Sequence, residues 1–178
     1  RLITWTYDPL ESRNSHLNIA RLGAVCNTYI CDYYGELRDG INQGLATDRF
    51  QVDWWIASRH AETHLTRQTA LRLDHYPSDN VPIINPAAWN DRNLPECHDP
   101  ISSDWPDRFL AEFPADFQAV KRADPALAVA WRAHLRQLCE GAFAAGFTVV
   151  DQVYEPGPPA RSFYLLQRIE SSESSLNV

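Results

Sequence analysis

Two histidines four residues apart have the clearest metal-ligand spacing in this sequence. His60 and His64 would lie on one face of a helix, where such a pair can chelate zinc. Glu62 stands outside the position that it would hold in a His-Glu-x-x-His motif, and it falls on another face. We therefore expect no metal site and favour surface histidines, with zinc binding as the alternative.

The cysteines offer no stronger chemistry. Their spacings match neither a zinc motif nor a small disulfide scaffold, and we expect reduced thiols at Cys26, Cys31, Cys97 and Cys139. His98 and Asp99 follow Cys97, but this cluster lies in a proline-rich segment without a second ligand pair, which favours a plain loop. Cys139 falls in an apolar helical stretch, where burial would raise its pKa and make packing its role.

Composition narrows the class of protein. The 178 residues carry a net charge of −7, enough chain for one domain or two small ones. Apolar runs are too short for a membrane span, and the first residues lack the pattern of a secretory signal. No basic stripe is present to bind a phosphate backbone. We expect a cytoplasmic protein that binds neither membranes nor nucleic acid.

The elements that would position a site begin with a strand over residues 1–8. Asp8 as a cap, Pro9 at the first helical position and Gly23 after the last predict a helix over 9–22. Two runs rich in β-forming residues, 24–34 and 49–58, predict a hairpin with a long connection. The first 58 residues therefore form a strand-helix-strand-strand unit.

A second unit of the same kind follows. Ser58 is expected to cap a helix reaching Leu73, and prolines make 74–107 a connector with a short strand near 81–84. A strand over 108–114, helices over 115–123 and 124–146, and strands over 147–156 and 161–168 complete the order. We expect a mixed α/β (α+β) fold divided into 1–58, a connector over 59–107, 108–170 and a disordered tail over 171–178.

The string WTYDPLESRNSHLNIARLGA, residues 5–24, followed by two strands, resembles the closing half of the GCN5-related N-acetyltransferase (GNAT) superfamily. A subgroup of predicted acetyltransferases is similar over nearly the whole chain. Its later motifs correspond to Trp131, Arg132 and Arg136, the AFAAG of 142–146, the VVD of 149–151 and the YLL of 164–166.

This resemblance implies an acetyl group transferred from acetyl-CoA to a primary amine of a small molecule or peptide. Residues 1–8 would be the fifth strand, which lines the gap that holds the coenzyme. The family's pyrophosphate loop, Arg/Gln-x-x-Gly-x-Gly/Ala, has no counterpart here, and its place is upstream of that strand. The resemblance therefore implies the C-terminal part of such an enzyme, which needs an N-terminal segment for activity.

Four residues of this unit are candidates for the site. Asn14 matches a helix asparagine that often contacts the coenzyme in relatives, and Asn18 lies one turn later on the same face, although both could instead bond the local backbone or solvent. Asp8 would be the base unless it only caps the helix, and Tyr7 would donate to an oxyanion or protonate the thiolate. Because strand residues alternate, at most one of these two faces the site.

Ile19 occupies the place of the tyrosine that many members use as the acid. Trp54 and Trp55 would form an aromatic wall for the acceptor or, as is commoner for large aromatic residues on a sheet, part of the core.

The second functional hypothesis is a non-catalytic module. In it, the edge of the first strand is completed by a partner chain or by a second copy in a homodimer.

Overall fold

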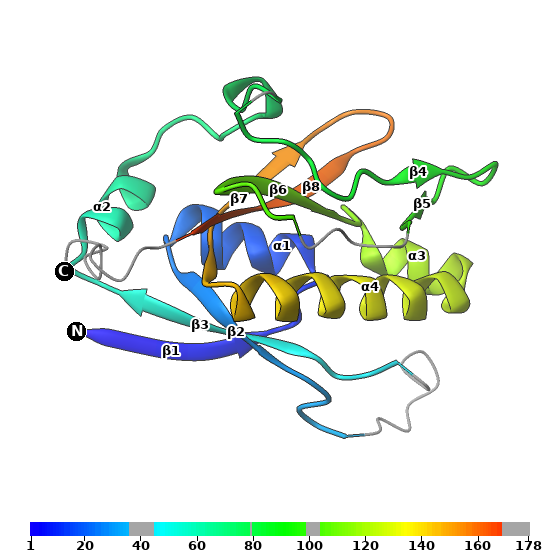
Figure 1. Ribbon diagram of the computed structural model, residues 1–178, viewed down its shortest axis with the longest axis horizontal. Coiled ribbons are helices and arrows are strands. Elements are labelled where there is room, and N and C mark those ends of the chain that lie inside the picture. Colours follow the sequence, from blue (N-terminus) through cyan, green and yellow to red (C-terminus); the bar gives the residue numbers. More distant parts are fainter. Residues whose placement is uncertain (36–44, 79, 99–103, 169–178) are drawn as a thin grey trace.

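The computed structural model describes residues 1–35, 45–78, 80–98 and 104–168, and these residues form an α+β fold (Figure 1). Its main sheet contains six strands: β1 (Leu2–Tyr7), β2 (Val25–Ile30), β3 (Arg49–Trp55), β6 (Arg108–Phe113), β7 (Phe147–Glu155) and β8 (Arg161–Arg168). The principal helices are α1 (Ser12–Ser15), the π-helical η1 (His16–Arg21), α2 (Arg59–Thr66), α3 (Phe117–Ala123) and α4 (Pro125–Ala144). The connector contains the 3₁₀ turn η2 (Leu73–His75) and a small ladder of β4 (Ala88–Trp89) with β5 (Pro95–Glu96).

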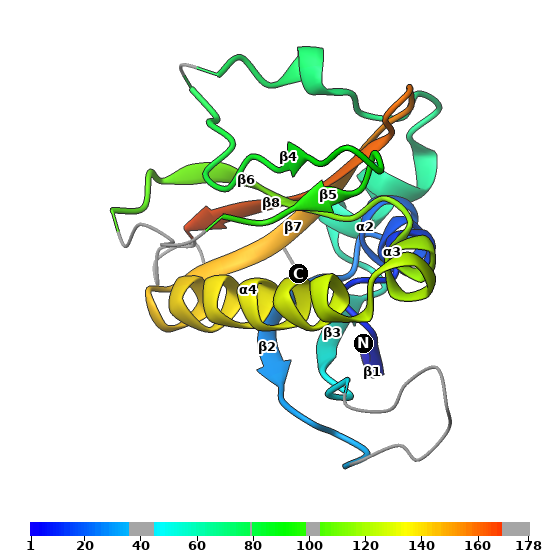
Figure 2. The ribbon, with the colours of Figure 1, turned by 90° about the vertical axis from the view of Figure 1, so that its right-hand side faces the viewer.

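The six strands follow the order β1-β3-β2-β7-β8-β6, and all neighbours run antiparallel. β2 and β7 share a single registered pair, Cys26 with Val149, whereas the other neighbours pair over long stretches. In both views α4 lies between the three strands of the first half and the three strands of the second (Figures 1 and 2). The sheet thus joins the two halves, and α4 lies between them (Figure 1).

One main core extends across both halves. Phe50 on β3, Trp131 on α4 and Tyr164 on β8 are fully buried in the same cluster. A second cluster, around Val153 and Phe163, lies where the connector packs against the strands of the second half. These contacts place residues from 2–55 and from 108–168 in a single sheet and core. The division of the chain into four segments remains a prediction. The tail over 171–178 lies outside the described residues.

The first helix begins later than the sequence predicts. Asp8 does not cap it: its carboxylate accepts a hydrogen bond from Leu10 N, its carbonyl accepts one from Glu11 N, and α1 starts at Ser12. Asp8 and Pro9 thus form a turn that precedes the helix. The predicted end is confirmed, because Gly23 adopts a left-handed φ of +67° directly after the helix.

The other predicted helices are mostly confirmed. Ser58 caps α2 by accepting from Ala61 N, but α2 ends at Thr66 and not near Leu73, because Arg67 is already extended. Asp124 caps α4 with Pro125 in its first turn, and Gly146 follows its end with φ +85°. The apolar stripe of α4 is buried, including Cys139, and this burial raises the pKa of its thiol.

Two arginines of α4 fasten the second half to the first. Arg132 forms a bidentate pair with Asp8, with N–O distances of 2.7 and 2.6 Å. One turn later, Arg136 forms a similar pair with the buried Asp48. Bidentate pairs of this kind fix orientation as well as distance, so α4 has a defined position against both β1 and β3.

Candidate functional site

Tyr7, at the end of β1, lies in the core. Its hydroxyl lies 3.1 Å from that of Tyr164, which itself donates to Pro9 O at 2.6 Å. Burial, followed by the neighbouring Tyr164, raises the pKa of Tyr7 well above its ordinary value. Tyr7 therefore connects β1 to β8 as a protonated, hydrogen-bonded phenol, and its role in transfer remains a prediction.

Asp8 contacts different elements from Tyr7. Both of its carboxylate oxygens bind Arg132 of α4, and Arg49 approaches at 3.9 Å. The bidentate pair engages both carboxylate oxygens, so neither is free to reach a substrate amine. The predicted base is thus an anchor for α4 in this structure.

The two predicted coenzyme contacts have different surroundings. Asn18 is buried, and its side-chain oxygen accepts from the indole N–H of Trp5 at 3.2 Å. Asn14 is exposed and makes no side-chain hydrogen bond to any part of the chain that the structure describes. Asn18 therefore fixes the helix against β1, whereas Asn14 is available to a ligand. The four predicted residues thus have different surroundings: Tyr7 meets Tyr164, Asp8 meets Arg132, Asn18 meets Trp5, and Asn14 is exposed.

Trp54 contacts the end of the first helix. Its indole N–H donates to Leu22 O at 2.8 Å, and its ring meets Trp5 edge to face. Trp54 therefore serves packing, the commoner of the two readings considered from the sequence, and the role of the half-buried Trp55 remains a prediction.

Within the described ranges, β1 pairs with a single strand, β3. Arg1 O accepts from Ile56 N, so alternate residues starting at Arg1 bond to β3, while the N–H and C=O groups of Leu2, Thr4 and Thr6 point away from the sheet. Leu2 and Ile3 are about two-fifths exposed. Within the described part of the chain this edge is unpaired and its first residues are exposed.

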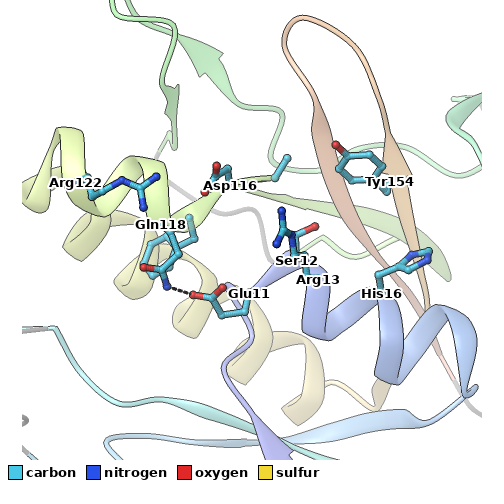
Figure 3. Close-up of a pocket in the computed structure, with 10 residues that line it drawn as sticks. Glu11, Ser12, Arg13, His16, Asp116, Gln118, Arg122 and Tyr154 are labelled. Atoms are coloured by element: carbon cyan, nitrogen blue, oxygen red, sulfur yellow. Dashed lines mark hydrogen bonds between the residues drawn. The ribbon is translucent and has the colours of Figure 1, made fainter. Parts of the chain in front are cut away.

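A cavity of about 630 Å³ lies beside α1 and the start of η1 (Figure 3). Arg13 and His16 border it, Arg122 of α3 lies across from them, and Tyr154 of β7 lies at one end. The remaining lining residues are Glu11, Ser12, Ala115, Asp116, Phe117 and Gln118. Its volume is in the range of small-molecule sites.

The helix that borders this cavity has an unusual hydrogen-bond pattern. η1 is π-helical, with Leu22 N donating to Leu17 O five residues earlier. π-helical turns are rare and occur often at functional sites. His16, at its first position, bonds through Nδ1 to Gln152 Oε1 at 3.2 Å. Because the amide oxygen accepts, Nδ1 carries the proton in the neutral ring.

The two histidines with metal-ligand spacing lie in a buried polar cluster instead. Their rings are 4.4 Å apart, and His64 Nδ1 lies 3.0 Å from Ala20 O. Arg67 binds the buried Asp151 at 2.9 Å, next to His64. His64 is almost fully buried, so the expectation of surface histidines was wrong for it. No group of three or more His, Cys, Asp or Glu residues suited to a metal occurs among the described residues.

We expect this cluster to make stability depend on pH. Burial, then the neighbouring His64, lowers the pKa of His60 from 6.5 to about 4. The unfolded chain therefore takes up a proton between these values that the folded chain refuses, so stability present above pH 6.5 is lost as the pH falls. Between pH 7 and pH 5 the native protein should lose about 1–2 kcal/mol relative to His60→Gln.

Urea unfolding of both proteins at the two pH values measures this difference. His98 is exposed, so His98→Gln is the matched control. The native protein and His98→Gln should lose the same stability between pH 7 and pH 5. Equal pH dependence of the native protein and His60→Gln would contradict the assignment.

No family model, curated protein or solved structure matches the chain. None of the helices in the described ranges has both the length and the apolar character to cross a membrane. The resemblance noted in the sequence thus remains a basis for proposals.

Sequence reasoning missed the cavity of Figure 3. Arg13 and His16, three residues apart on a helix that begins near them, were the available signal, since such residues share a face. Arg122 and Tyr154 are more than 100 residues further along the chain, and no local pattern connects them to that helix. The Asp99 of the proposed Cys97 cluster lies outside the described residues.

Proposed function

We propose that this chain is part of an acyl-CoA-dependent N-acyltransferase of GNAT type, which transfers an acetyl group to a primary amine. The observation that carries the proposal is the free edge of β1, followed directly by the helix that bears Asn14. The observed order β1, helix, β2, β3 agrees with the unit for which the resemblance was noted.

The edge is suited to the amide-rich pantetheine arm of acetyl-CoA. Three outward-facing peptide groups, at Leu2, Thr4 and Thr6, provide donors and acceptors in strand spacing, as in recognition by β-augmentation. Asn14 supplies a free side-chain amide. In this proposal Asn18 acts through Trp5, as a positioning residue, and acyl transfer requires a phosphate-binding segment outside these 178 residues.

The base and acid of the proposed transfer are not assigned to Asp8 and Tyr7 by geometry alone. Asp8 would have to leave Arg132, and the Tyr7 hydroxyl would have to leave Tyr164, before either could act on a substrate. We retain both as candidates only for a state in which bound acetyl-CoA has separated Asp8 from Arg132 and Tyr7 from Tyr164.

Proline at Thr4 tests the edge directly. It removes one outward N–H without touching the bonds to β3, and proline is tolerated on edge strands. We expect acetyl-CoA to shift the amide resonances of Leu2, Thr4 and Thr6 in the native protein and to bind Thr4→Pro about tenfold more weakly. Thr4→Ala, which keeps the N–H, is the control and should bind like the native chain.

Acetyl-CoA that perturbs no β1 amide at millimolar concentration, or that binds Thr4→Pro as well as Thr4→Ala, would refute a coenzyme site at this edge. Nuclear magnetic resonance titration serves both measurements, because it also reports whether Thr4→Pro keeps its fold.

A non-catalytic interaction module is the second candidate, favoured by the exposure of Leu2 and Ile3 on the same edge. An unpaired edge with apolar side chains is a template for a strand of another chain or a second copy. Here the native protein would self-associate in analytical ultracentrifugation, and Thr4→Pro would be monomeric. A monomer at high concentration that still binds acetyl-CoA supports the enzyme.

A further inference from the structure

The cavity of Figure 3 contains charges of both signs that do not neutralise one another. Among the residues that the structure describes, Arg13 and Arg122 form no ion pair. Glu11 accepts from Gln118 through Oε1, and Asp116 accepts from Ala119 N through Oδ1, which leaves one oxygen of each carboxylate without a donor in the described part of the chain.

Many arginines of this chain pair with carboxylates, namely those at 49, 67, 72, 92, 132, 136, 161 and 168. Within the described ranges Arg13 and Arg122 form no such pair, although two carboxylates line the same cavity. In a protein with a net charge of −7, arginines that remain unpaired beside two carboxylates indicate separation across a space. Figure 3 shows Arg13 on the α1 side and Arg122 with Asp116 on the α3 side of that space.

Beside the polar Ser12, His16 and Gln118, three residues add apolar or aromatic surface to the lining. Phe117 forms a buried wall, Ala115 is half-buried, and Tyr154 presents a two-fifths exposed ring at one end. A ligand here would meet cationic and anionic groups together with an apolar surface. Purely anionic molecules would be repelled by Glu11 and Asp116, and purely cationic ones by the two arginines.

We propose that this cavity binds a small zwitterion of the amino-acid class, with its carboxylate on Arg13 and Arg122 and its ammonium on Asp116 and Glu11. Guanidinium groups match carboxylates in shape and charge, and carboxylate oxygens accept from an ammonium. The apolar part of the ligand lies on Phe117 and Tyr154. The proposal does not depend on acyl transfer, since it concerns binding alone.

Titration calorimetry with L-phenylalanine and two analogues tests the pairing. 3-Phenylpropanoate lacks the ammonium and 2-phenylethylamine lacks the carboxylate, so each should bind at least about tenfold more weakly than phenylalanine. All titrations use one ionic strength, because surface charge effects are screened by salt. Phenylpropanoate that binds as well as phenylalanine would overturn the zwitterion, as would the absence of saturable binding by phenylalanine.

Charge-removing variants locate the site. Arg13→Gln/Arg122→Gln should weaken phenylalanine about tenfold and leave 2-phenylethylamine no weaker. Asp116→Asn keeps a good cap for α3 and should weaken phenylalanine while leaving phenylpropanoate no weaker. Arg59→Gln removes an exposed, unpaired arginine of α2, away from the cavity, and should change nothing. Equal losses in Arg59→Gln and the double variant would overturn the assignment.

Discussion

Replacing Asp8 by alanine is expected to lower the free energy of unfolding by about 3–5 kcal/mol. The Arg132 side chain is almost completely buried, with 4% exposed, and its guanidinium lies over the ring of Phe117. Among the described residues, Asp8 is the one carboxylate at hydrogen-bond distance from this guanidinium. Its Nε already lacks a partner there. Loss of Asp8 would leave a buried, uncompensated charge, which is the costly case for an ion pair.

Urea unfolding followed by tryptophan fluorescence measures this loss. Asp107 pairs with Arg168 at 3.7 Å but its side chain is 97% exposed, so Asp107→Ala is the matched control and should cause no measurable change. Adding Arg132→Met to Asp8→Ala removes the isolated charge and should recover part of the stability. A loss in Asp8→Ala no greater than in the control would show that the pair contributes nothing.

The same variant separates the two roles of Asp8. An anchor for α4 predicts a less stable protein whose remaining folded fraction loses little specific activity. A catalytic base predicts lost activity in a protein of native stability. Activity per folded molecule, measured in the longer protein that the proposed function requires, therefore decides between them.

Gly23→Ala is expected to cost about 3 kcal/mol of stability. A Cβ at this position would lie 2.9 Å from His64 Cβ and 3.1 Å from the backbone Cα of Ala61. The residue also has φ +67°, which favours glycine. Alanine would thus be strained in its own backbone and would push α2 away from the end of η1.

Gly146→Ala isolates the conformational part of this effect. Gly146 has φ +85°, but a Cβ there would meet no atom within 4 Å. We expect a loss of about 1 kcal/mol for Gly146→Ala, from backbone strain alone. Thermal unfolding of the two variants measures the difference. Equal losses of stability would mean that α2 moves away from the new side chain at position 23 at no measurable free-energy cost.

The contact at Gly23 also links the fold to the polar cluster of His60 and His64. Movement of α2 would bring water to His64 and Asp151, which are both buried. The pH dependence expected from His60 should therefore diminish in Gly23→Ala, because the lowered pKa of His60 arises mainly from burial.

Local chemistry determined most of the secondary structure. Caps at Ser58 and Asp124, Pro125 in the first turn of α4 and glycines at the ends of two helices all act within a few residues, so the sequence was sufficient for them. The buried stripe of α4 follows in the same way from the spacing of its apolar residues.

The start of the first helix was decided by tertiary structure. Asp8 has a side chain suited to capping, but Arg132, 124 positions later, holds both of its oxygens. The same carboxylate also accepts from Leu10 N, and this bond closes a turn at Asp8 and Pro9 that delays the helix to Ser12. Local signals could not reveal Arg132, because it lies far along the chain.

The sequence by itself determined most of the helices and strands and the mixed α/β class. Only the tertiary structure decided that the strands of both halves share one sheet and core, that Tyr7 and Asp8 meet Tyr164 and Arg132, and that Arg13 faces Arg122 across a cavity. The physical reason is range: helix and turn signals act over about four residues, whereas burial and charge pairing depend on which distant segments the packed core brings together.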